Sequence, residues 1–302
     1  MEFKLFSRPV KKKREKITPL AIVIVTFLIL YCVVLLTLLI WGLIASFKEP
    51  NTDFRVNPIG LPKEWIATNY SSVYQYFTIE VQTASGVAYV TFPMLFLYEF
   101  IYALGCAFVG TLVPCITSYL CAKFDYKFSK LIYLIVIVTM ILPIVGNLPS
   151  EIQMAKTFGL YDSIWGVWVL KANFLGLYFI VFYNYFRSIP NAYIEAARID
   201  GASNLRILLR VILPMARPIF MTVMLITFIS FWNDYQTPLI YMKSYPTIAV
   251  GLYNIVFQPA NQFFNVPCQM AAASLMLVPV LIIFLLFHKK LLGNLTMGGI
   301  KG

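Results

Sequence analysis

Residues 193–214 read YIEAARIDGASNLRILLRVILP and place two acids, three arginines and a glycine in a chain that is otherwise strongly apolar. Their local chemistry predicts two short helices joined by a turn. Gly201 can take the left-handed conformation that ends a helix, and Ser203 can cap the helix that follows. That second helix, residues 204–213, carries an apolar stripe at helical spacing, formed by Leu205, Leu208, Leu209 and Ile212. The first helix presents Glu195 beside two alanines, a compact surface suited to docking in a groove of another protein.

The composition around this loop is that of a membrane protein. Of 302 residues, 60% are hydrophobic and 12% are charged, with a mean hydropathy of +0.78. Runs long enough to cross a bilayer as helix occur at residues 20–44, 94–122, 131–148, 164–186, 218–231 and 270–287. These runs are continuous rather than alternating, which disfavours a transmembrane barrel. We therefore expect an all-α polytopic fold with six transmembrane helices.

Charge placement predicts the orientation of these spans. The segments 1–19, 123–130, 187–217 and 288–302 together hold 18 of the 24 Lys and Arg residues and 5 of the 13 acids. Positive charge stays in the cytoplasm during insertion, so both termini are expected there. The predicted organisation is a basic N-terminal segment 1–19, a six-helix domain 20–287 and a cytoplasmic tail 288–302. The net charge of +11 then follows from topology, and no nucleic-acid partner is expected.

The sequence contains few residues that could bind a metal or act in catalysis. The five cysteines form no CxxC pair and read as small buried hydrophobes, and the single histidine, His288, follows the sixth run directly, so no metal site is predicted. The ionisable residues within the spans, Glu99, Lys171 and Asp234, do not form a catalytic pair. An intramembrane enzyme is thereby disfavoured, while a channel or transporter is not.

The opening stretch resembles the EAA loop of bacterial ABC importer permeases, whose pattern is Glu-Ala-Ala, three residues, glycine, nine residues and Ile-x-Leu-Pro. The positions that match in register are Glu195, Ala196, Ala197, Gly201, Leu213 and Pro214. Val211 stands where the pattern has isoleucine. Flanking segments such as YFRSIPNAYIEAARIDGAS, FWNDYQTPL, SYLCAKFDYKFSK and GNLTMGGIKG extend the likeness from Leu20 onward. Together they indicate the MalG-like, carbohydrate-uptake branch of these permeases.

This resemblance implies a type I ABC importer permease fold whose EAA coupling loop, residues 188–214, docks on an ATPase. The implied coupling residues are the six matched positions together with Arg198 and Asp200, and the tail residues Lys301 and Gly302 are implied to contact the ATPases. The implied partners are a second, MalF-like permease subunit, two copies of an ABC ATPase and an extracellular or periplasmic solute-binding protein. No GxxxxGK[ST] sequence occurs here. ATP and Mg are therefore expected on the ATPase, with no cofactor and no enzymatic activity in this chain.

The implied function is import of a sugar or oligosaccharide, with another polar solute such as a glycerol phosphate, or an ATP-independent secondary transporter, as alternatives. Candidates for the translocation path are aromatic and short polar residues, for which interhelical hydrogen bonds or a place in the interfacial aromatic belt are at least as good an interpretation: Asn147, Tyr183, Asn184, Trp232, Asn233 and Asp234. Lys171 either extends to the membrane surface or offers a cation to an acidic sugar. Residues 48–92 form either a docking surface for the binding protein or a plain connecting loop. Relatives usually carry Asn-Ser where this chain has Tyr98 and Glu99, so substrate contacts are not transferred from them.

Overall fold

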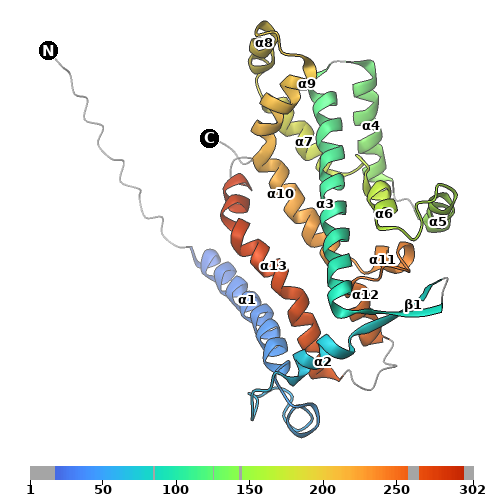
Figure 1. The fold of residues 1–302 in the computed structure, drawn as a ribbon. Helices are drawn as coiled ribbons and strands as arrows, with labels where there is room; N and C mark the ends of the chain where they lie inside the picture. The colour runs from blue at the N-terminus through green and yellow to red at the C-terminus, as the bar shows by residue number, and fades with distance from the viewer. Residues whose placement is uncertain (1–17, 84–85, 125, 143–144, 258–264, 296–302) are drawn as a thin grey trace.

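The structure, a computed structural model, describes residues 18–83, 86–124, 126–142, 145–257 and 265–295, and it is dominated by helices (Figure 1). The helices are α1 Pro19–Ala45, η1 Pro50–Phe54, α2 Thr68–Tyr76, α3 Phe92–Lys123, α4 Lys127–Ile141, α5 Leu148–Thr157, α6 Ile164–Lys171, α7 Leu177–Ser188, α8 Ala192–Ile199, α9 Asn204–Ile207, η2 Leu208–Ile212, α10 Leu213–Trp232, α11 Gln236–Tyr241, α12 Ile248–Phe257 and α13 Val266–Leu295. The strands are β1 Thr78–Thr83 and β2 Gly86–Thr91.

Four helical segments of the described chain are long and apolar enough to cross a membrane: Pro19–Ala45, Phe92–Lys123, Asn204–Trp232 and Val266–Phe287. Helix α3 is central and packs against α6, α7 and α10 (Figure 1). Helix α1 contacts α13 but is exposed along almost its whole length. A helix that is apolar on every side while packing on one neighbour must be covered by lipid or by another membrane protein.

The third and fourth predicted spans differ from these four. The third, expected over residues 131–148, is the shorter helix α4, which ends at Ile141. Pro143 stands two residues later in the sequence, and a proline disfavours helix in the residue before it. The fourth, expected over residues 164–186, is broken into α6 and α7 by a non-helical segment at residues 172–176, where Gly176 has φ +122°. The predicted count of six transmembrane helices is therefore not exact, because only four helical segments of the described chain are long and apolar enough to span a membrane.

The predicted boundary between the coupling loop and the fifth span was also wrong. Residues 204–213 do not form a separate helix, because α9, the π-helical turn η2 and α10 make one continuous helix over Asn204–Trp232. The apolar stripe shifts with it: Leu205 and Leu209 are exposed, whereas Ile207 and Ile212 are buried. The π-helical turn contains an extra residue, which rotates the side chains that follow it about the helix axis. The i, i+3, i+4 spacing read from the sequence therefore does not predict which residues share a face across this turn.

Residues 48–92 hold a small folded unit at the end of the molecule opposite α8 (Figure 1). Strands β1 and β2 pair as an antiparallel hairpin, with Thr78 opposite Thr91 and Thr83 opposite Gly86. Asn69 of α2 donates from its side-chain amide to the carbonyls of Ser46 and Lys48, each at 2.8 Å. The segment is therefore more than a plain connecting loop, and the all-α prediction is confirmed apart from this one hairpin.

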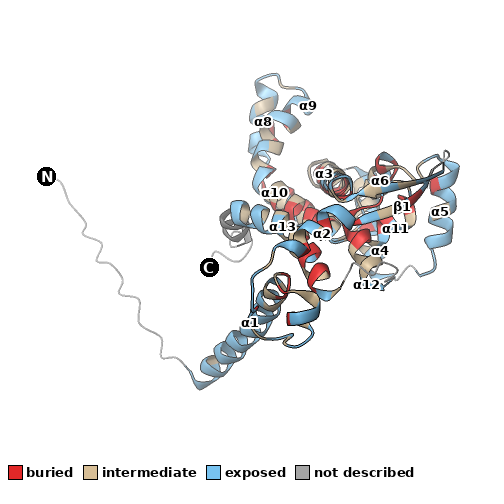
Figure 2. Cartoon of the chain, turned by 60° about the horizontal axis from the view of Figure 1, so that its bottom comes forward, coloured by how far each residue is buried: buried red, intermediate tan, exposed pale blue. Residues whose placement is uncertain are grey.

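Two principal cores occupy the two ends of the helix bundle. The larger lies toward the hairpin and joins α2, α3, α6, α10, α12 and α13 around Trp232 and Tyr102. The other lies toward α8 and centres on Phe182, Phe186 and Ile212. Figure 2 shows the buried residues gathered in the bundle, whereas α1, α5, α8 and α9 are mostly exposed.

Candidate functional site

The coupling loop has the helix–turn–helix form that its residues predict. Gly201 takes φ +76°, and its N–H donates to the carbonyl of Arg198 at 3.0 Å, closing the end of α8. Ser203 caps the next helix, because its Oγ accepts from the N–H of Arg206 at 3.4 Å. An added Cβ on Gly201 would meet no atom of this chain within 4 Å. The glycine is thus required by its backbone conformation, not by packing within the chain.

One face of the loop anchors it to the bundle. Ile194 of α8 and Ile207 of α9 are buried in the core formed with Phe186 and Ile189. Lys123, the last residue of α3, donates from Nζ to the carbonyl of Ile189 at 2.5 Å and to Oδ1 of Asn191 at 2.9 Å. These contacts hold the loop firmly at the end of the membrane helices.

The opposite face of the loop is open. Glu195, Ala196, Arg198, Asp200 and Gly201 are all exposed, and Ala197 is half-buried. Among them stand large apolar side chains that a solvated surface would not favour: Tyr193, Ile199 and Leu205 are 51%, 87% and 64% exposed. Large apolar side chains exposed among charged residues are typical of a protein-binding site.

The remaining coupling positions begin the long helix. Leu213 packs against the core near α8, and the exposed Pro214 follows the π-helical turn inside the continuous helix, where it has no N–H to donate to the preceding turn. Lys301 and Gly302 lie outside the described residues.

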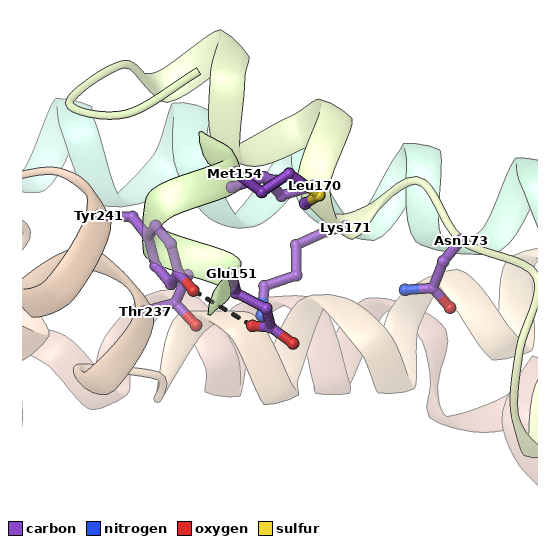
Figure 3. A pocket seen from close by; sticks show the side chains of 7 residues that line it. All are labelled: Glu151, Met154, Leu170, Lys171, Asn173, Thr237 and Tyr241. Atoms are coloured by element: carbon purple, nitrogen blue, oxygen red, sulfur yellow. Dashed lines mark hydrogen bonds between the residues drawn. The ribbon is translucent and has the colours of Figure 1, made fainter. Parts of the chain in front are cut away.

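A pocket of about 220 Å³ lies near the other end, between α5, α6 and α11 (Figure 3). It brings Lys171 and Asn173 together with Glu151, Thr237 and Tyr241. The Tyr241 hydroxyl donates to Oε2 of Glu151 at 3.2 Å, and burial, together with that neighbouring carboxylate, raises the pKa of Tyr241. The pocket thus offers an anion, a cation, an amide, hydroxyl groups and an aromatic ring within one small volume.

Two of the predicted pathway residues lie in or beside this pocket. Lys171 is the last residue of α6, directly before the non-helical segment that interrupts the predicted fourth span. Its Nζ lies 6.0 Å from the centroid of the Phe231 ring. Asn147 donates from Nδ2 to Oε1 of Glu151 and is exposed. The sequence analysis missed Glu151 and Tyr241, which stand 90 positions apart and are joined only by the fold.

The family comparison supplies the deciding observation. Residues 110–293, more than half of the chain and including the whole coupling loop, match the model of the binding-protein-dependent transport system inner membrane component. The chain belongs to this family of permeases. The resemblance read from the EAA positions is thereby confirmed.

The similar proteins include permeases that are named after the transport systems to which they belong. The diacetylchitobiose uptake system permease protein NgcG of Streptomyces coelicolor is 26% identical over 90% of this chain and 86% of its own length. The trehalose/maltose transport system permease protein MalG of Thermococcus litoralis is 26% identical over 91% of this chain and 94% of its own. The fold is shared with a bacterial ABC transporter involved in the import of the acidic polysaccharide alginate, with a TM-score of 0.72, 22% identity and coverage of 93% of this chain and 99% of that one.

Within this permease, three predicted pathway residues hold the corner between α10 and α11. Trp232 is fully buried and donates from Nε1 to the carbonyl of Met276 at 3.0 Å. Asp234 accepts from the Tyr102 hydroxyl at 2.9 Å through Oδ2, and its Oδ1 accepts from two backbone N–H groups that begin α11. Asn233 donates back to the carbonyl of Ile229 at 2.8 Å. Trp232 and Asp234 thus make the interhelical hydrogen bonds that were the alternative reading, whereas the bond of Asn233 stays within α10.

The other two predicted residues lie elsewhere in the permease. Tyr183 of α7 packs its ring on Tyr133 at 4.7 Å between centroids and lines a different pocket, near α8, and Asn184 follows it as an exposed residue. The structure therefore does not gather the predicted pathway residues at a single site.

Glu99, where the sequence analysis expects this chain to differ from related permeases, lies inside the protein. Its side chain is fully buried in α3, and Oε2 accepts from the N–H of Ala249 at 3.0 Å, at the start of α12. Among the described residues, the second carboxylate oxygen, Oε1, has no hydrogen-bond partner. Glu99 thus connects α3 to α12 and faces the protein interior.

Proposed function

We propose that this chain is one of two permease subunits of an ATP-driven, binding-protein-dependent importer that passes a sugar or oligosaccharide into a bacterial cytoplasm. The observation that carries the proposal is the exposed, partly apolar face of the coupling loop over residues 192–203, which is anchored to the bundle through Ile194 and is not covered by other described residues. Relatives named for diacetylchitobiose and for trehalose/maltose transport support the carbohydrate assignment.

The coupling loop is the seat for one ATPase subunit. Ala196 and Ala197 permit close approach, Glu195 offers a carboxylate to a basic residue of the ATPase cleft, and Ile199 supplies an apolar anchor. The firm attachment through Ile194 lets closure of the ATPases move the membrane helices as a body. One loop per permease requires a second, MalF-like permease for the second ATPase copy. ATP and Mg bind to those ATPases, and this chain is not itself an enzyme.

The membrane orientation follows from charge. Segments 1–19 and 288–302 lie in the cytoplasm with the coupling loop, and the hairpin end faces the solute-binding protein. Residues 20–287 form six crossings, in which α4 and the broken pair α6 and α7 supply the third and fourth. The basic N-terminal segment also favours anionic lipid at the inner surface. Lys301 and Gly302 extend to the ATPases from the cytoplasmic end.

The pocket around Lys171 is the proposed polar contact site for the substrate, at the end of the chain that faces the solute-binding protein. Sugars are bound by hydroxyls, amides and carboxylates arranged beside an aromatic ring, and Glu151, Asn173 and Tyr241 provide such a set. Asn147 orients Glu151. The residues at the corner of α10 and α11, Trp232, Asn233 and Asp234, position this side of the pathway. Because Lys171 is positively charged and lines this pocket, an anionic solute such as a glycerol phosphate is the second candidate substrate.

The test is reconstitution of the complete importer with its partner permease, ATPase and binding protein in proteoliposomes, using maltose and diacetylchitobiose as first probes. Uptake that requires ATP and the binding protein is expected. Uptake driven by an ion gradient without ATP would identify a secondary transporter and overturn the proposal.

A second arm tests the pocket. Lys171→Met is expected to reduce uptake, and Lys156→Met is the matched control, because Lys156 lies on α5 outside the pocket lining. Equal uptake by the two variants would remove the pocket from the pathway while leaving the importer assignment intact.

A further inference from the structure

The turn between α5 and α6 contains the only non-glycine residue of the described chain with a left-handed backbone. Asp162 has φ +57° and is half-buried. This conformation is strained for a residue with a β-carbon, although aspartate tolerates it better than most. Strain of this kind persists only where surrounding contacts hold the residue in place. The contacts of Asp162 therefore indicate which part of the fold depends on this turn.

Asp162 bonds the residues that end and follow α11, and Ser244 among them lies 82 positions further along the chain. The N–H of Asp162 donates to the carbonyl of Tyr241 at 2.8 Å. Oδ1 of the carboxylate accepts from the N–H of Ser244 at 2.7 Å, and Oδ2 accepts from the Ser244 hydroxyl at 2.6 Å. Hydrogen bonds to a charged acceptor are stronger than those between neutral groups. Asp162 thus joins the α5–α6 turn firmly to residues 241–244.

Tyr241 is held at both of its ends. Its carbonyl accepts from Asp162, while its hydroxyl donates to Oε2 of Glu151, on α5, at 3.2 Å. Figure 3 shows this second bond among the side chains that line the Lys171 pocket. The ring of Tyr241 also lies 6.4 Å, between centroids, from the ring of Tyr161, the residue before Asp162. The α5–α6 turn therefore fixes the side chain that brings an aromatic ring and a hydroxyl to the pocket.

Asp162 is not one of the residues that line the pocket, whereas Tyr241 is. An effect of Asp162 on a bound solute must therefore pass through Tyr241. A binding group works well only when its neighbours hold it within about 0.5 Å of the productive geometry. The bonds of Asp162 to the backbone around Tyr241 supply such support.

We propose that Asp162 is a positioning residue of the Lys171 pocket, which holds the Tyr241 ring and hydroxyl where a passing sugar contacts them. This inference rests on the proposed function of the pocket as a contact site for the substrate. A contact that only stabilised the fold would lower uptake and ATP hydrolysis together. A misplaced Tyr241 instead lowers the number of sugar molecules imported for each ATP hydrolysed.

The first experiment measures uptake and hydrolysis together in proteoliposomes that contain the complete importer, with whichever of maltose and diacetylchitobiose the unmodified importer takes up. Asp162→Gly removes the carboxylate without adding strain, because glycine adopts a positive φ freely. It should lower uptake per ATP about fivefold, the scale of one lost hydrogen bond. Asp162→Asn should retain most of the uptake, because asparagine also tolerates this backbone and its amide can bond Ser244 at both positions.

Ser163→Ala is the matched control. Ser163 stands next to Asp162 but caps α6, because its Oγ accepts from the N–H of Gly166 at 3.3 Å. Its loss should lower thermal stability while leaving uptake per ATP unchanged. An equal fall in uptake per ATP for Ser163→Ala and Asp162→Gly would overturn the positioning role.

A double-mutant cycle with Tyr241→Phe tests the route of the effect. If Asp162 acts through the Tyr241 hydroxyl, Asp162→Gly should have a smaller effect on uptake per ATP in the Tyr241→Phe background, whereas independent effects add. Full additivity of the two substitutions would show that Asp162 does not act through this hydroxyl.

A measurement without solute separates this inference from the proposed function. Burial, together with the neighbouring Glu151 carboxylate, raises the pKa of Tyr241. With fluorotyrosine at position 241 of the complete importer, Asp162→Gly should lower that pKa toward its ordinary value, because both causes weaken when the side chain is released. Ser163→Ala should leave it unchanged. The same fluorine NMR titration in Asp162→Gly as in the unmodified importer would overturn the inference, whereas uptake of neither sugar by the unmodified importer would contradict the proposed function.

Discussion

Replacing Gly201 by aspartate tests whether the turn of the coupling loop touches an ATPase. Gly201 has φ +76°, and its added Cβ would meet no atom of this chain within 4 Å. Any cost beyond backbone strain must therefore come from a partner. The strain itself is about 1–2 kcal/mol for a side chain in the left-handed region.

Gly159 provides a matched control at the other end of the molecule. It has φ +68° and also meets nothing within 4 Å, but it lies in the turn between α5 and α6. Gly201→Asp and Gly159→Asp should therefore lower the melting temperature of the isolated chain by similar small amounts. A carboxylate forced without a partner into a docked interface adds about 1–3 kcal/mol, or roughly a 5- to 150-fold loss of affinity.

The assay is pull-down of the ATPase by the permease pair, together with hydrolysis stimulated by the loaded binding protein in nanodiscs. Gly201→Asp should lose ATPase association while Gly159→Asp retains it. If both variants bind the ATPase as the unmodified chain does, the turn does not contact the ATPase. If both lose it equally, the effect reflects general destabilisation.

Three further predictions concern single features of the chain. Glu195→Lys should abolish ATPase pull-down, since a like-charge contact costs several kcal/mol in a semi-buried interface, and a charge reversal in the ATPase cleft should partly restore it; no rescue by any cleft residue would contradict the ion pair. Gly105→Ala should lower thermal stability by about 1–3 kcal/mol, because its Cβ would lie 1.8 Å from the Trp168 ring, whereas Gly110→Ala on the same helix, with its nearest neighbours at 3.8 Å, should not; equal melting temperatures would contradict the close packing of α3 on α6. Deleting residues 298–302 should lower transport-coupled hydrolysis without affecting membrane insertion, and an unchanged rate would show that the tail does not contribute.

The coupling loop was predictable because its determinants are local. Gly201 ends one helix and Ser203 begins the next through bonds to residues at most three positions away. The exposed position of Glu195 follows from the same short pattern. Such features depend on the chain's immediate neighbours, which a sequence displays directly.

The break in the fourth span was not predictable from hydropathy. Hydropathy measures partition into lipid and is blind to whether a run is one helix or two, and residues 172–176 read ANFLG, apolar apart from one asparagine. The available signal was Asn173 with Gly176 beside Lys171, since irregular backbone at membrane depth occurs where protein or a polar cavity covers it. The Lys171 pocket lies beside this break, and Glu151 and Tyr241 line it only through tertiary packing.

The fifth span shows a similar limit. The sequence predicts that Pro214 ends the coupling loop, whereas it lies inside a continuous helix, directly after the π-helical turn at Leu208–Ile212. A π-helical turn has no strong residue signature, so the sequence predicted a loop helix followed by a separate span.

The unbroken path from Asn204 to Trp232 has a consequence for building hybrid transporters. Each residue added to or removed from a helix rotates everything beyond it by about 100°. The extra residue in the turn at Leu208–Ile212 therefore sets the angle, about the helix axis, between the exposed α8 surface and the α10 face that carries Trp232. Chimeras of two permeases that are joined within this turn must keep its number of residues. Otherwise the coupling loop is expected to point away from the ATPase of the other transporter, even when every contact residue is retained.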